Sequence, residues 1–114
     1  MTNIENSYKR AGQFFYLSSA LHVVAILVSA GGLFAQLFPA AILWALVGYG
    51  LINKGWRWLA YLGFIGALIG IVASITLATG NTGLTRIAMY SITLADLGAA
   101  LLLFVALWRN PQET

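Results

Sequence analysis

The chain has 114 residues, of which 61% are hydrophobic and only 8% are charged. A soluble domain of this length has too little interior to bury so much apolar surface, and soluble proteins usually carry about a quarter charged residues. The net charge is +3, but the cations stand singly or in pairs at the ends of apolar segments. This placement is typical of membrane-edge anchors and excludes a nucleic-acid-binding stripe.

The first apolar segment carries no charge over residues 11–53. A helix needs about 20 residues to cross the hydrocarbon of a bilayer, so this segment is long enough for two crossings and must turn back on itself. Gly31 and Pro39 interrupt it, and a proline suits the first turn of a new helix. We therefore predict helices over about residues 11–30 and 37–52.

Two further apolar segments follow, each preceded by turn-forming residues. Residues 53–58 combine two cations with two indoles, as expected where a chain emerges at the lipid headgroups. Residues 79–83 contain two glycines, an asparagine and two threonines, which favour a turn. We predict the remaining helices over about residues 58–78 and 84–108. The fold class is then an all-α membrane protein, with the whole chain 1–114 forming one domain, an up-and-down bundle of four transmembrane helices.

Four crossings place both termini on the same side of the membrane, and the cations indicate which side that is. Five of them share it, namely Lys9, Arg10, Lys54, Arg57 and Arg109. Arg86 stands alone on the opposite side. By the positive-inside rule, we expect a multi-pass protein of the inner (plasma) membrane with cytoplasmic N and C termini.

Small residues recur every three or four positions along the third predicted helix. They are Gly63, Gly66, Gly70 and Ser74. In lipid, helices associate through close backbone approach and van der Waals contact, which small residues permit. We interpret this packing stripe either as contact inside the four-helix bundle or as the interface of a homo-oligomer.

Asp96 is an acid inside a predicted span, where a carboxylate costs ~2.5–3.5 kcal/mol even on the most lenient insertion scale. At a rise of ~1.5 Å per residue, it lies about 20 Å from the membrane boundary at Arg109. His22, the only histidine, lies about 18 Å from the same boundary on the first helix. The first and last helices are neighbours in a closed up-and-down bundle, so we predict a His22–Asp96 hydrogen bond.

Other polar side chains on the same helix faces support this intramembrane pair. Ser19 and Ser29 share a helical stripe with His22, and Thr93 shares one with Asp96. Three interpretations remain open for the pair. It is a fixed hydrogen bond that locks two helices, a proton-binding or substrate-binding site, or a contact with another subunit.

The sequence offers little for catalysis or for a resident cofactor. It contains no cysteine, no nucleophile–base–acid set and no phosphate-binding loop, so we expect no enzymatic activity. The single histidine is too few for a zinc cage or for bis-histidine haem within one chain, so we expect no metal and no cofactor. Trp44, in the middle of the second predicted helix, is interpreted as a lipid-facing or space-filling side chain.

These observations favour a small, non-enzymatic membrane protein that serves as an accessory, assembly or scaffold subunit. Its expected partners are the lipid bilayer and either copies of itself or a larger membrane complex, without nucleic acid. The alternative is a small proton-coupled transporter or channel whose site at mid-membrane is formed by Asp96 and His22.

Overall fold

A computed structural model describes the backbone of residues 2–109 and the side chains of residues 7–108. The regular secondary structure of this part of the chain is all helical, with no strand. Its elements are the α-helices α1 (Thr2–Val28), α2 (Phe34–Asn53), α3 (Arg57–Thr79) and α4 (Gly83–Phe104), and the π-helical turn η1 (Val105–Arg109). Four helical segments are long and apolar enough to cross a membrane.

Three helix boundaries differ by more than two residues from those predicted. Helix α1 begins at Thr2, because its polar first residues continue the helix beyond the apolar segment. Helix α2 begins at Phe34, so the prediction that Pro39 occupies the first turn was wrong and Pro39 lies inside the helix. A proline there removes one intrahelical hydrogen bond without ending the helix. The last helix changes from α to π geometry at Val105.

Each of the three turns contains, or is directly followed by, a glycine whose backbone conformation is costly for other residues. Gly31, Gly55 and Gly83 have φ angles of 83°, 65° and 63°. Ala30 also adopts this left-handed conformation, with φ of 56°. The Gly31 N–H donates to the Ile26 carbonyl over 2.9 Å, which closes the end of α1 and sends the chain back towards α2.

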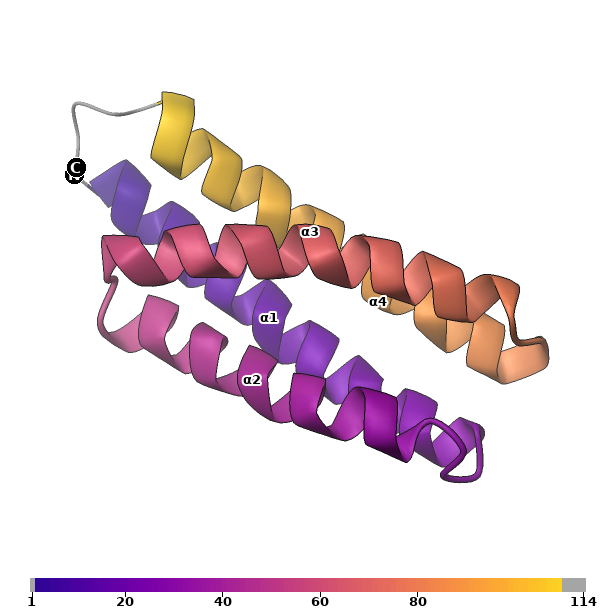
Figure 1. The fold of residues 1–114 in the computed structure, drawn as a ribbon. Coiled ribbons are helices and arrows are strands. Elements are labelled where there is room, and N and C mark those ends of the chain that lie inside the picture. The colour runs from indigo at the N-terminus through magenta and orange to yellow at the C-terminus, as the bar shows by residue number, and fades with distance from the viewer. Residues whose placement is uncertain (1, 110–114) are drawn as a thin grey trace.

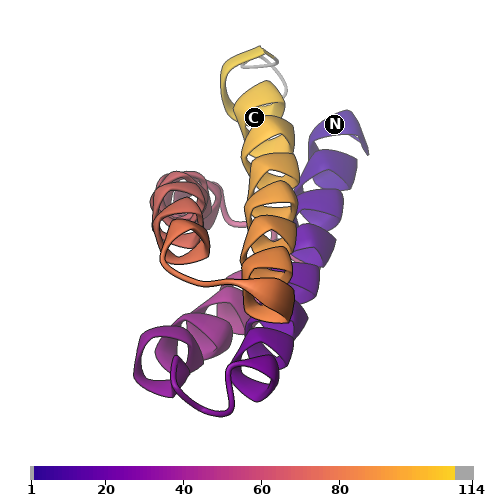
Figure 2. The ribbon, with the colours of Figure 1, turned by 90° about the vertical axis from the view of Figure 1, so that its right-hand side faces the viewer.

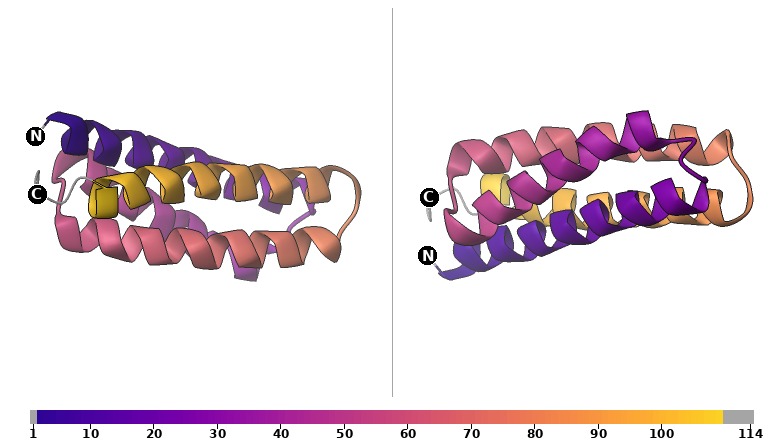
Figure 3. Two further views of the ribbon diagram at one scale, coloured as in Figure 1. Left: turned by 90° about the horizontal axis from the view of Figure 1, so that it is seen from above. Right: turned by 90° about the horizontal axis from the view of Figure 1, so that it is seen from below.

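The helices form a bundle with one loosely packed seam (Figure 1). Helix α1 packs closely against α2 and α4, and α3 packs closely against α4, whereas α2 and α3 touch each other little. The end-on view in Figure 2 shows α1 beside α4 and α3 set apart from α2. The turns after α1 and α3 lie at one end of the bundle, and the turn after α2 lies at the other (Figure 3). The bundle is 46 Å long, close to the ~40–45 Å thickness of a bilayer with its headgroups.

The interior consists of two apolar clusters with polar side chains between them. The cluster at the end that carries η1 includes Phe15, Val47 and Leu103. The cluster at the opposite end includes Leu37, Met89 and Ile92. The buried polar side chains between them come from α1, α3 and α4, and they are Ser18, His22, Ser74 and Asp96.

The packing stripe of α3 faces the interior of the same chain. A Cβ atom added to Gly63 would lie 3.3 Å from the Phe15 ring, and one added to Gly66 would lie 3.2 Å from the Trp44 indole. A Cβ atom added to Gly70 would overlap a carboxyl oxygen of Asp96. These contacts favour packing inside the bundle as the role of the stripe.

We therefore expect Gly70→Ala to lower the melting temperature of the purified protein in detergent. The added methyl group has no space beside Asp96, and overpacking of this kind costs about 1–3 kcal/mol. Gly80→Ala is the matched control, because the nearest atom to a Cβ there is 3.8 Å away. A Gly70→Ala protein that melts like the parent but changes its oligomeric state would instead place the stripe at an interface between copies.

Candidate functional site

Asp96 projects from the middle of α4 into the centre of the bundle and has no exposed surface. The Trp44 indole Nε1–H donates a hydrogen bond to the Asp96 Oδ1 atom over 3.0 Å. Helices α2 and α4 are not among the closely packed helix pairs, so the indole reaches across the bundle to make this bond. Trp44 is only 7% exposed and belongs to the apolar cluster at the η1 end, so the lipid-facing interpretation was wrong and the space-filling one is confirmed. The bond gives the indole N–H an acceptor and gives one oxygen of the buried carboxyl group a donor.

The second carboxyl oxygen of Asp96 has a different environment. Asp96 Oδ2 packs against Gly70 and makes no hydrogen bond within the described part of the chain. The Ser18 hydroxyl on α1 neighbours this carboxyl group, is itself fully buried and is likewise unpaired among the described residues. Ser18 was not among the predicted site residues, although it lies one helical turn from His22 on the same face of α1.

His22 lies near Asp96 as predicted from its depth, but the predicted hydrogen bond between them was wrong. The His22 Nδ1–H donates to the Ser18 carbonyl, one turn earlier on α1, over 2.6 Å. The imidazole is therefore bonded to the backbone of its own helix. Its ring centre lies 6.3 Å from that of Trp44. His22 remains within electrostatic range of Asp96, with the indole beside both. Trp44, rather than His22, is the hydrogen-bond partner of the acid.

The other predicted polar residues make separate local bonds instead of one continuous network. The Ser19 hydroxyl donates to the Ala41 carbonyl over 2.7 Å and joins α1 to α2. The Thr93 and Ser74 hydroxyls lie 2.6 Å apart and join α4 to α3. The Ser29 hydroxyl donates to the Ile26 carbonyl over 3.0 Å, in the turn after α1. Ser19, Thr93 and Ser74 thus tie neighbouring helices together, and Ser29 stabilises a turn.

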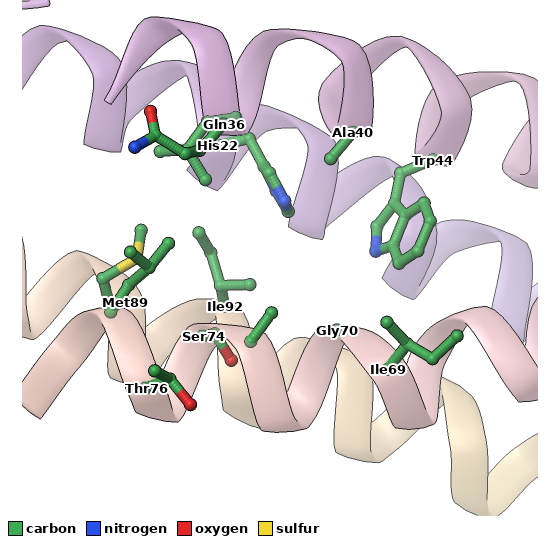
Figure 4. A pocket seen from close by; sticks show the side chains of 13 residues that line it. His22, Gln36, Ala40, Trp44, Ile69, Gly70, Ser74, Thr76, Met89 and Ile92 are labelled. Atoms are coloured by element: carbon green, nitrogen blue, oxygen red, sulfur yellow. The ribbon is translucent and has the colours of Figure 1, made fainter. Parts of the chain in front are cut away.

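A cavity of about 430 Å³ opens between α2 and α3, on the side of Trp44 that leads towards the α1–α2 turn. Figure 4 shows the His22 imidazole and the Trp44 indole on one side of it, with Gly70, Ser74, Met89 and Ile92 on the other. Asp96 is not among its lining residues. A second cavity of about 340 Å³ lies between the same helices on the other side of Trp44, and its lining is entirely apolar. The Trp44 side chain therefore separates two openings of one groove.

The chemistry available at this site is hydrogen bonding and proton binding. Among the described side chains, no three His, Cys, Asp or Glu residues lie close enough together to hold a metal ion. Asp96 and His22 are the titratable side chains among the buried polar residues between the two apolar clusters, and they differ in access. The carboxyl group is sealed by Trp44 and Gly70, whereas the imidazole reaches the cavity.

We expect Trp44→Phe to destabilise the protein in detergent by about 1–3 kcal/mol, because it removes the donor from a buried carboxyl group. The measurement is thermal unfolding, with Trp58→Phe as the control because Trp58 is 60% exposed. The loss should be smaller when Trp44→Phe is introduced into an Asp96→Ala protein, since the two residues are coupled. Equal losses in both backgrounds would show that the bond contributes nothing to stability.

Comparison of the chain with protein-family models, with curated proteins and with solved structures gave no match. What the structure establishes is therefore a bundle of four apolar helices compatible with a small multi-pass membrane protein, with a sealed carboxyl group and an accessible imidazole at its centre.

Proposed function

We propose that the helices form an up-and-down bundle across the inner membrane, with both termini in the cytoplasm. The distribution of cations supports this orientation, since Lys9, Arg10 and Lys54 are exposed at the end that carries the α2–α3 turn. Arg86, near the opposite end, is engaged locally: its Nε–H group lies 3.0 Å from the Ala78 carbonyl and 2.9 Å from the Asn81 carbonyl. Arg86 thereby closes the end of α3. One cation at this end and several at the other give the asymmetry of positive charge on which the positive-inside rule depends. The side chain of Arg109, the fifth cation assigned to the cytoplasmic side, lies outside the described residues.

This orientation can be tested by single-cysteine labelling, because the chain contains no cysteine. Lys54 and Thr82 are exposed residues in turns at opposite ends of the bundle. A membrane-impermeant maleimide should label Thr82→Cys in intact spheroplasts, and Lys54→Cys only in inverted vesicles. The reverse pattern would place the termini outside, and labelling of both from one side would contradict a four-span topology.

We further propose that the protein is a non-enzymatic accessory, assembly or scaffold subunit of a membrane complex or homo-oligomer. The observation that carries this proposal is the sealed carboxyl group. Asp96 is fully buried, bonded to Trp44 and separated from the cavity, so its environment is that of a helix-locking residue. A proton-coupled site would need water or substrate to reach the acid. If Asp96 serves to stabilise the fold, partners would bind to the outer, lipid-facing surface of the helices.

That outer surface suits lipid or another membrane protein. Large apolar side chains are prominently exposed on each of the four helices, among them Leu27, Leu46, Val72 and Leu94. In membranes such faces pack against acyl chains or against the helices of a partner. The polar side chains of Ser18, His22, Ser74 and Asp96, by contrast, are buried.

One observation favours the alternative of a small proton-coupled transporter or channel. His22 lines an open cavity, and its Nε2 atom has no hydrogen-bond partner among the described residues. An imidazole in this position can exchange a proton with a ligand. Under this second candidate, His22 would be the accessible half of the site, and movement of Trp44 would be needed to expose Asp96.

The two candidates differ in what accompanies the protein and in the effect of Asp96→Asn. The chain should be extracted from its native membrane in copolymer nanodiscs and its mass determined without detergent. We expect a stoichiometric larger assembly that Asp96→Asn leaves intact, because the asparagine carbonyl can still accept the Trp44 N–H. A chain that is extracted by itself, and whose proteoliposomes carry a proton flux abolished by Asp96→Asn, would replace this proposal with the transporter.

A further inference from the structure

The cavity between α2 and α3 has one free hydrogen-bonding group deep inside it. His22 is only 5% exposed, lines the cavity and directs its imidazole into the space between the two helices (Figure 4). Gln36, Ser74 and Thr76 also line the cavity. The Ser74 and Thr76 hydroxyls are bonded to Thr93 and to the Val72 carbonyl, and Gln36 is an exposed residue in the first turn of α2. Among the buried polar groups of the lining, the imidazole Nε2 is therefore the one without a hydrogen-bond partner.

The hydrogen bond at the other ring nitrogen determines what His22 offers. A carbonyl oxygen can only accept, so the 2.6 Å bond from Nδ1 to the Ser18 carbonyl requires the proton to be on Nδ1. In the neutral imidazole, Nε2 then carries a lone pair and is an acceptor. A ligand that satisfies it must bring a hydrogen-bond donor.

The remaining walls select for a neutral and largely apolar ligand. No Lys, Arg, Asp or Glu lines the cavity, so it provides nothing to compensate a phosphate, a carboxylate or an ammonium group. Trp44 forms one end of the cavity and Met89 lies on its α4 side. Indole rings and thioethers both make favourable contacts with an aromatic ring. The volume of about 430 Å³ is in the range of small-molecule sites.

The seam between α2 and α3 gives such a ligand a route from the hydrocarbon. These two helices touch each other little, and the cavity opens between them. A molecule dissolved in the bilayer can therefore enter sideways without crossing a polar layer. This combination of lateral access, an acceptor and aromatic contacts defines the chemical class of the ligand.

We propose that the α2–α3 cavity binds a neutral, membrane-dissolved molecule with a phenolic head, whose O–H donates a hydrogen bond to His22 Nε2 while its ring packs against Trp44 and Met89. The apolar remainder of the molecule extends through the seam into the bilayer. This binding site is independent of whether the protein belongs to a larger complex.

The test uses the full chain in lipid nanodiscs and two probes that differ only in the donor, 4-hexylphenol and its methyl ether 4-hexylanisole. Binding is measured by calorimetric titration, with empty nanodiscs as the background. The parent protein should bind the phenol roughly tenfold more tightly than the ether, since the ether leaves Nε2 without a donor. His22→Phe should bind both probes equally weakly.

Two substitutions separate loss of the site from loss of the fold. Ala73→Leu fills the cavity without changing His22 or Ser18, and it should abolish binding of both probes. Ala20→Leu places the same side chain at an exposed position of α1 outside the cavity, and it should bind like the parent. Equal binding of phenol and ether by the parent, or unchanged binding by Ala73→Leu, would overturn the proposal. Because the measurement uses the chain by itself, either failure leaves the accessory-subunit proposal standing.

Discussion

A carboxyl group inside a bilayer must find its hydrogen-bond donors within the protein, because hydrocarbon supplies none. Asp96 finds one in the Trp44 indole, which crosses the bundle from α2 to reach α4. Much of the central architecture follows from this bond. It fixes the separation of α2 and α4 and places a bulky ring on the inner face of α3. It also divides the groove between α2 and α3 into two cavities.

The glycines of α3 provide the space that the Trp44 ring occupies. Gly66 and Gly70 leave their face of the helix without side chains, and the indole occupies the space. Helices α2 and α3 are consequently in contact through the Trp44 side chain of α2 and the backbone of α3. Small residues more often allow the backbones of two helices to approach each other closely. This explains why a regular glycine stripe coexists with a seam at which the two helices touch little.

The sequence predicted the four apolar helices, the positions of the three turns and the proximity of His22 to Asp96, because these depend on hydrophobic length and helical rise. It did not predict the partner of the acid. Depth leaves the direction of each side chain undetermined, and the His22 ring bonds to its own helix. Trp44 could have been considered, since a tryptophan at mid-membrane also carries an N–H that needs an acceptor. The cavity was beyond prediction, because it depends on how far α2 and α3 separate.

The order of residues along the chain also matters for how this acid enters a membrane. Synthesis proceeds from the N-terminus, so Trp44 emerges before Asp96, and the α1–α2 hairpin is complete before α4 has been made. The donor is therefore already in place when the helix bearing the carboxyl group arrives. Insertion in chain order would bring the helix that carries Asp96 into the membrane after the helix that carries Trp44. A permuted chain beginning with α3 and α4 would have to expose the same acid to lipid until the tryptophan followed.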